Sequence, residues 1–285
     1  GIKKQNTSDT QTPVINSPMA DNIEHIHNEH NIKRPDPYYW MRDRENPKVI
    51  DHLNAENEYT KKVSAPLADL QKEIFDEMLG RIQEDDLSVP AKDGDWWYYT
   101  KTEKGKEYSV YCRKKGSLDA PEEILLDVNK LAEGKEYVQI GSFSISPDHN
   151  IMAYAIDDTG REKYDIYFTD LTTGEILSDK LTDISPSIKW GNDNQTIFYT
   201  TRDKALRPWQ IYRHVLGNPI KKDDLLYQED DNQFYVGIYK GNSNQFLFAY
   251  SASTLTTEIR YLDANKPDGQ FQLITPRSHK TEYWV

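Results

Sequence analysis

The spacing of hydrophobic positions changes in the first part of this chain. Before the change, apolar residues recur at helical intervals, and after it they alternate with polar residues as in half-buried strands. The first pattern predicts helices over about 47–63 and 66–83, and Asn46-Pro47 supplies a capping residue followed by proline in the first turn. The change of spacing predicts a domain boundary at about 85–92.

Beyond this boundary the strand pattern repeats with a period of about 45–48 residues. An apolar strand follows a polar turn at Met152–Ala155, Ile197–Thr200 and Phe246–Ala249. Such a period is typical of β-propeller blades, whose small sheets bury their faces against one another. A β-sandwich is the structural alternative, but it requires no fixed period. We therefore predict a mainly β fold with about four propeller blades, over 96–133, 143–184, 187–231 and 234–277.

The two ends of the chain differ from this repeat. Residues 1–32 are rich in Ser, Thr, Asn and Gln and are expected to form a flexible polar leader. Its histidines His25, His27 and His30 fall on neither one helix face nor one strand face, so we interpret them as surface residues and not as metal ligands. Tyr283–Val285 predicts the first strand of a fifth blade, and we therefore expect this chain to be a piece of a longer protein.

Composition narrows the class of protein. The 19 Tyr, 6 Trp and 8 Phe argue against a disordered chain, while the net charge of −12 argues against nucleic acid as a partner. No apolar run approaches the roughly 18 residues of a membrane span. The single cysteine, Cys112, excludes an internal disulfide, and its alternating neighbours predict a half-buried strand position. No metal and no cofactor are expected.

Several segments resemble the oligopeptidase B branch of the prolyl oligopeptidase family. Pro37–Asp43 (PYYWMRD) is similar to the N-terminal signature of that branch, departing from it at Pro37 and Met41, and Leu53–Tyr59 (LNAENEY) is similar to its following helix. The similarity continues in family order to the end of the chain. The further matching stretches are Glu77–Pro90, Asp158–Tyr164, Asp170–Glu175, Arg207-Pro208, Arg213–Gly217 and Glu229–Phe234.

The resemblance implies a serine peptidase in which a seven-bladed propeller covers an α/β-hydrolase domain. Residues 33–85 would form a helical arm on that hydrolase domain, and residues 86–285 would form an incomplete propeller. The parent enzyme would hydrolyse short peptides after Arg or Lys, with carboxylates receiving the basic side chain. Proline specificity of the parent, and a propeller that serves only as a binding scaffold, are the alternatives. We expect a cytoplasmic protein, with the periplasm as the alternative.

The catalytic residues of such an enzyme are expected outside this chain. A hydrolase of this type needs a G-x-S-x-G turn, followed in chain order by Asp and His. Gly241–Gln245 has the first glycine and Ser243 but lacks the last glycine, and it lies in a predicted hairpin turn. We therefore assign no catalytic residue here and expect the chain alone to be inactive.

Arg161 and Glu162 are the candidate contact residues. They lie in a loop of the second predicted blade. The resemblance implies that the loops on one side of the propeller face the hydrolase domain and the substrate. They would form an interdomain ion pair or hold a peptide end. The alternative is a solvated loop whose surface pairs contribute about 0–1 kcal/mol. Tyr38, Tyr39 and Trp40 are interpreted as packing residues of the arm and not as a ligand-stacking face.

Overall fold

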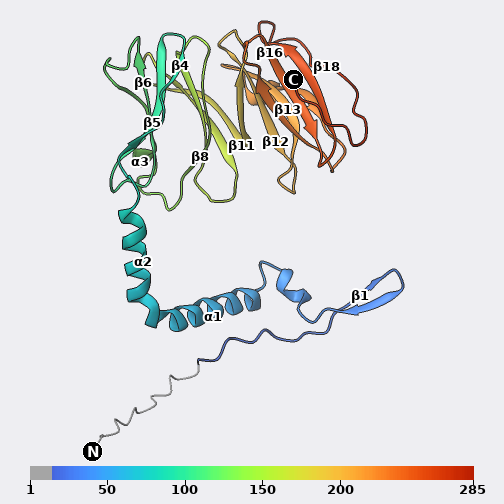
Figure 1. Cartoon of the computed structure of the whole chain (residues 1–285). Helices are drawn as coiled ribbons and strands as arrows, with labels where there is room; N and C mark the ends of the chain where they lie inside the picture. Colours follow the sequence, from blue (N-terminus) through green and yellow to red (C-terminus); the bar gives the residue numbers. More distant parts are fainter. Residues whose placement is uncertain (1–14) are drawn as a thin grey trace, which may run out of the picture. The chain divides into compact units, whose positions relative to one another are not determined.

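The computed structural model describes residues 15–285, which divide into two compact units with the boundary between Gln83 and Glu84 (Figure 1). The first unit holds a small hairpin and the two long helices, and the second holds all the remaining strands together with two short helical turns. The predicted mainly β fold with a helical N-terminal segment is confirmed.

The first unit begins with a β-hairpin that the sequence pattern did not indicate. His30 and Asn31 form its turn, both with positive φ, and this pair gives a weaker turn signal than Asn-Gly. His25 stacks on Tyr39 with ring centroids 3.8 Å apart, and His27 Nε2 lies 3.0 Å from an Asp36 carboxylate oxygen. The elements of this unit are β1 (Ile26–Glu29), β2 (Ile32–Pro35), η1 (Tyr39–Arg42), α1 (Pro47–Ser64), η2 (Ala65–Leu67) and α2 (Ala68–Gly80).

Both predicted helices are present. Asn46 accepts a hydrogen bond from the backbone N–H of Lys48 and caps α1, as its position before Pro47 indicates. Helix α2 carries a row of exposed apolar side chains at helical spacing, namely Leu70, Ile74, Phe75 and Met78. Trp40 is half-buried and donates to the carbonyl of Asp21 across 2.9 Å, whereas Tyr38 is exposed.

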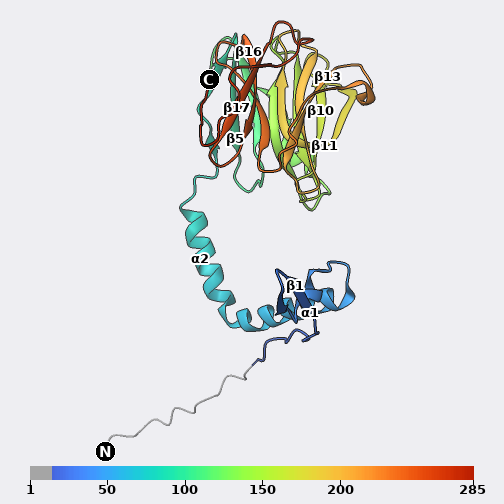
Figure 2. The same cartoon turned by 90° about the vertical axis from the view of Figure 1, so that its right-hand side faces the viewer.

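The second unit contains four propeller blades built of antiparallel strands (Figure 2). The second and third blades share one long strand and so form a single seven-stranded sheet, whereas the first and fourth blades are sheets of five and four strands. The first blade is β3 (Asp86–Leu87), β4 (Ala91–Asp93), β5 (Trp96–Thr102), β6 (Val110–Lys115) and β7 (Glu123–Asp127), followed by α3 (Val128–Leu131). The second is β8 (Gln139–Ile145), β9 (Ile151–Asp157), β10 (Tyr164–Asp170) and the start of β11 (Ile176–Trp190).

The third blade takes its inner strand from the end of β11. It continues through β12 (Thr196–Arg202), β13 (Pro208–Val215), η3 (Ile220–Lys222) and β14 (Asp224–Gln228). The fourth is β15 (Tyr235–Lys240), β16 (Phe246–Ala252), β17 (Thr257–Asp263) and β18 (Gln272–Leu273). Residues 281–285 form no strand, although the sequence predicts the first strand of a fifth blade there.

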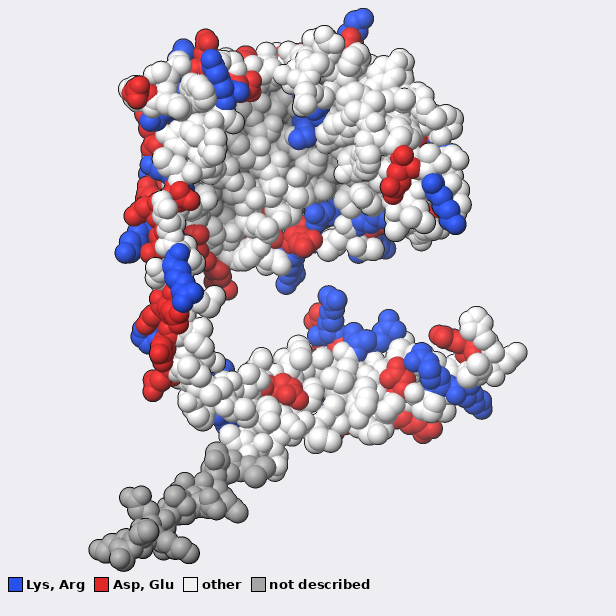
Figure 3. Space-filling view, in the orientation of Figure 1, with Lys and Arg blue, Asp and Glu red and all other residues white. Residues whose placement is uncertain are grey.

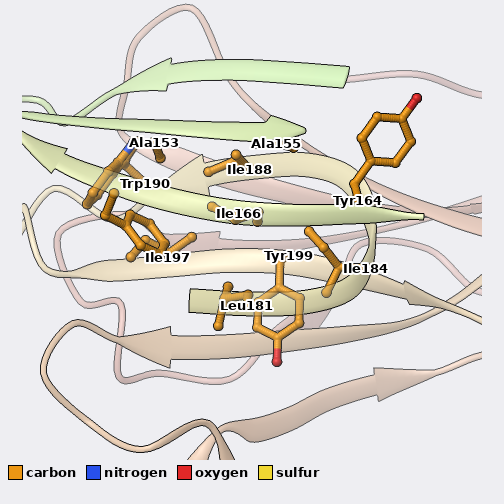
Figure 4. Packing of buried hydrophobic residues seen from close by; sticks show 11 residues of the cluster. Ala153, Ala155, Tyr164, Ile166, Leu181, Ile184, Ile188, Trp190, Ile197 and Tyr199 are labelled. Atoms are coloured by element: carbon orange, nitrogen blue, oxygen red, sulfur yellow. The ribbon is translucent and has the colours of Figure 1, made fainter. Parts of the chain in front are cut away.

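The core of this unit lies in the seams between neighbouring blades. Alternate residues of β12 face opposite ways: Ile197 and Tyr199 pack against the second blade, whereas Phe198 packs against the fourth. Figure 4 shows the seam between the second and third blades, where Trp190 and Ile188 meet Ala153 and Ile166. Every interior strand therefore needs apolar residues on both faces.

Cys112 is more deeply buried than the sequence predicts. It is 1% exposed and packs with Tyr99 and Val110 in the first blade. Burial, with a smaller effect from the charge of Glu122, raises the pKa of its thiol to about 11. The thiol therefore stays protonated near neutral pH, as suits a packing residue and not a nucleophile.

Candidate functional site

The loops of the four blades gather at two opposite ends of the second unit. One end, the turn rim, carries the hairpin turns at 146–150, 191–195 and 241–245. The other end, the loop rim, carries the loops at 157–163, 203–207 and 253–256. Hydrogen bonds between neighbouring blades join turn to turn, from Asp148 N–H to Asn194 Oδ1, and loop to loop, from Arg202 to the Glu162 carbonyl.

A buried aspartate shapes the loop that holds the predicted contact residues. Asp157 is 1% exposed, and its carboxylate accepts from the backbone N–H groups of Thr159, Gly160 and Glu162 at 2.8–3.1 Å. Burial alone raises the pKa of this carboxyl, but these hydrogen bonds outweigh it and the net pKa is lowered. These hydrogen bonds stabilise the conformation of the loop.

The structure places Arg161 and Glu162 at the loop rim, with different surroundings. Arg161 is exposed, and its side chain has no hydrogen-bond or ion-pair partner within residues 15–285. Glu162 has a positive φ of 57°, and its side chain is 66% exposed. Its carbonyl accepts from Arg202 Nη1 across 2.6 Å, and its carboxylate lies 3.5 Å from the same nitrogen.

Arg202 is therefore a rim residue that the sequence did not identify. It comes from the third blade, 40 positions beyond Glu162, and its guanidinium also lies 5.8 Å from the centroid of the Tyr164 ring. Its Nε is buried without a hydrogen-bond partner in the described chain. The only sequence signal is that Arg202 ends β12, directly before the loop at 203–207, which lies about one repeat period beyond the loop that holds Glu162.

The loop at 203–207 is also held by an aspartate that accepts from backbone N–H groups, but here an arginine of the same loop contacts the following blade. Asp203 accepts from the backbone N–H groups of Ala205 and Arg207 and from Arg207 Nε, at 2.8–3.0 Å. Arg207 Nη1 then donates to the carbonyls of Asp231 and Phe234, at 3.0 and 2.6 Å. Arg207 thus fixes the link between the third and fourth blades.

A cavity of about 530 Å³ opens beside this link. The buried carboxylate of Glu229 accepts from the N–H of the lining residue Asp231 and from Arg277, Tyr227 and Ser251. Burial opposes ionisation, but these partners outweigh it and lower the pKa of Glu229 to about 2. The residues lining the cavity are Asp231, Gln233, Phe234, Ser253, Thr254, Leu255, Thr256 and His279.

The polypeptide enters the second unit at the loop rim. Thr102 Oγ1 donates to the Glu84 carbonyl and Lys104 N–H to Asp85 Oδ1, both across 2.6 Å. Asp86 pairs with Thr102 at the end of β5. Figure 3 shows charged side chains concentrated along the edges of the unit, whereas the hollowed face between them is mostly uncharged.

Within residues 15–285, no histidine ring nitrogen forms a hydrogen bond with a serine hydroxyl. His214 lies between the carboxylates of Asp223 and Asp179, at 2.7 and 3.1 Å, and His149 Nδ1 lies 2.7 Å from the Tyr98 hydroxyl. Ser243 sits in the turn between β15 and β16, where its Oγ accepts from the Gln245 N–H. Residues 15–285 include no group of three or more His, Cys, Asp or Glu side chains placed to hold a metal ion.

Comparison with known proteins decides the family. Residues 18–285 match the family described as prolyl oligopeptidase, N-terminal beta-propeller domain. The chain belongs to this family. It is 40% identical over 272 residues to dipeptidyl aminopeptidase BI of Pseudoxanthomonas mexicana, covering 89% of this chain and 38% of that protein. It is 37% identical over 278 residues to protease 2 of Moraxella lacunata, covering 94% of this chain and 40% of that one.

Solved structures agree with this membership. Oligopeptidase B from Leishmania major superposes with a TM-score of 0.86 at 33% identity, over 94% of this chain and 40% of that chain. Oligopeptidase B from Trypanosoma brucei, with covalently bound antipain, gives 0.85 at 31% identity, over 93% and 40%. The chain thus spans 38–40% of the length of these relatives. Among the described helices, none has the length and apolar character needed to cross a membrane.

Proposed function

We propose that this chain is the substrate-filtering N-terminal portion of a serine oligopeptidase that hydrolyses short peptides after Arg or Lys. The observation that carries the proposal is the superposition of 94% of the chain on oligopeptidase B, of which it covers 40%. The remaining length would hold the α/β-hydrolase domain and the blades that complete the propeller. Peptides short enough to pass the propeller would reach the hydrolase, and folded proteins would not.

The Ser-His-Asp triad is proposed to lie outside residues 1–285. A nucleophile needs a base within about 2.6–3.2 Å and an oxyanion site beside it. Ser243 instead sits in a hairpin turn at the turn rim, and His214 is held by two carboxylates. The chain alone would therefore be inactive.

The loop rim is proposed to face the hydrolase domain. The polypeptide enters the propeller at this rim, so a domain connected through residues 33–85 has a short path to it. The exposed apolar row on α2 needs a partner, because such a surface is costly to leave in water. We propose that the hydrolase domain covers this row and that the arm spans 33–85, ahead of the incomplete propeller at 86–285 and after a leader at 1–32.

Arg161 and Glu162 are proposed as contacts to the hydrolase domain or to a peptide end. In the longer protein, Arg161→Ala and Glu162→Gln are expected to lower kcat/KM roughly 3- to 30-fold, since each removes a charge-assisted hydrogen bond. Steady-state kinetics and thermal unfolding of each variant measure the effect. Lys221→Ala, at an exposed position of η3 away from the loop rim, is the matched control. Unchanged kinetics in both variants would contradict the proposed contacts and indicate that the loop is only a solvated surface.

Hydrolysis of blocked fluorogenic peptides tests the function as a whole. The longer protein is expected to cleave after Arg and Lys, to be blocked by a serine-reactive inhibitor, and to lose activity when cut back to residues 1–285. Cleavage after proline, and not after Arg or Lys, would show that the longer protein has proline specificity. A requirement for an unblocked amino end would favour the activity named for the Pseudoxanthomonas relative. Absence of all peptidase activity would favour a binding scaffold.

A further inference from the structure

A second cavity, of about 270 Å³, lies at the turn rim, at the opposite end of the propeller from Arg161 and Glu162. The inner strands of all four blades contribute to it. Its lining includes two lysines, Lys189 from β11 and Lys240 from β15. The other lining residues are Asp93, Ser144, Ile145, Pro147, Trp190, Asn192 and Asn244.

Lys240 occupies a position that is apolar in the two preceding blades. The backbone N–H groups of Ser146, Gly191 and Gly241 each close the same turn, donating to a carbonyl five residues ahead. The residues just before them, Ile145, Trp190 and Lys240, are therefore structural equivalents. The fourth blade thus replaces a large apolar side chain by an ammonium group, which donates to Asn192 Oδ1 across 2.5 Å.

Lys189 comes from the facing side of the same seam. It pairs in register with Phe198 of β12, and Phe198 packs against the fourth blade. Lys189 is only partly exposed, and it has no hydrogen-bond or ion-pair partner in the described part of the chain. An ammonium group that has lost part of its hydration is unfavourable unless an anion or a neutral acceptor replaces the lost hydrogen bonds.

The charges around the cavity distinguish the two lysines. Burial lowers the pKa of both, and for Lys240 the nearby charges of Asp93 and Asp193 partly offset this effect. Lys189 has no such offsetting charge. Lys189 is therefore the group that gains most from an arriving anion.

We propose that Lys189 and Lys240 form a binding site for a small oxyanion, a carboxylate or a phosphate group, at the turn rim. Lys189 would supply the main charge-assisted hydrogen bond. Lys240, fixed by Asn192, would supply the second cation across the seam. A volume of about 270 Å³ suits a group of this size rather than a whole peptide.

Calorimetric titration of the full chain tests the proposal, with three probes: inorganic phosphate, acetyl-dialanine with a free carboxylate, and the same peptide amidated. Phosphate and the free carboxylate are expected to bind, and the amide is not. Binding of phosphate alone, or of the carboxylate alone, would show which of the two oxyanions the site takes. Lys189→Gln is expected to weaken binding roughly tenfold or more, whereas Lys189→Arg retains it. Lys221→Gln, at an exposed lysine of η3, is the matched control and should bind as the unchanged chain does.

Acetylation of lysines in the unchanged chain, followed by mass spectrometry, gives a second readout that needs no folded variant. Saturating phosphate is expected to slow modification of Lys189 and to leave Lys221 unaffected. Two results would overturn the proposal: no binding of either anion to the unchanged chain, or equal affinity in the chain and Lys189→Gln.

Discussion

Asp223→Ala is expected to lower the free energy of unfolding by about 3–5 kcal/mol, because it removes one partner from a buried charged group. His214 is fully buried, with Asp223 at its Nδ1 and Asp179 at its Nε2. The Asp223 carboxylate also accepts from the Tyr199 hydroxyl across 2.8 Å. The substitution would thus leave the Nδ1 of a buried imidazole and a buried hydroxyl without their acceptor, while His214 Nε2 keeps Asp179.

The same network gives the effect a defined pH dependence. Burial alone lowers the pKa of His214, but its hydrogen bonds and the charges of Asp223 and Asp179 outweigh burial and raise it. A raised pKa in the folded state means that the stabilisation is complete below the unfolded value of about 6.5 and is lost as pH rises through the folded value. The destabilisation by Asp223→Ala should therefore be larger at about pH 6 than at about pH 9.

Urea unfolding at both pH values measures this prediction. Asp158→Ala, which removes an exposed ion pair with Lys135, is the matched control and should cost less than about 1 kcal/mol. An effect of Asp223→Ala as small as that of the control, or one that grows with pH, would contradict the account of the His214 network.

Phe198→Ala is expected to cost about 3–5 kcal/mol, the range for truncating a buried phenylalanine. Phe198 is fully buried in the seam between the third and fourth blades and meets Phe271 edge to face, with ring centroids 6.1 Å apart. The loss combines the transfer free energy of the removed ring atoms with the cost of the cavity left behind. Chemical unfolding followed by tryptophan fluorescence measures the change.

Phe75→Ala on α2 is the matched control, since Phe75 is 61% exposed. In the 285-residue chain it should change stability by less than about 1 kcal/mol. In the longer protein the cost should rise, because we propose that the hydrolase domain covers this face. Equal costs for the two phenylalanines in the present chain would contradict the assignment of the blade seam as the core.

The repeat was visible in the sequence because each blade needs the same local features. Strands such as β9, β12 and β16 are apolar on both faces and follow polar turns, so their period survives changes of individual residues. The hairpin of β1 and β2 was not visible, since His30-Asn31 is an uncommon turn pair in a polar segment.

The candidate site was only partly predictable. The sequence indicated Arg161 and Glu162 through one loop, and Asp157 lies in that loop as its shaping group. Arg202 was missed because its contact with Glu162 crosses a blade seam, and such contacts depend on how blades stack rather than on spacing within one loop. The cavity of Lys189 and Lys240 was missed for the same reason, since four strands far apart in sequence build it.

Labelling with a fluorophosphonate probe, followed by peptide mapping, tests the central claim most directly. The account predicts one labelled serine in the longer protein, located beyond residue 285, and no labelling of the 285-residue chain alone. Labelling of a serine within this chain, Ser243 included, would place the chemistry in the propeller portion and contradict the assignment of this chain as the filtering part of a serine oligopeptidase.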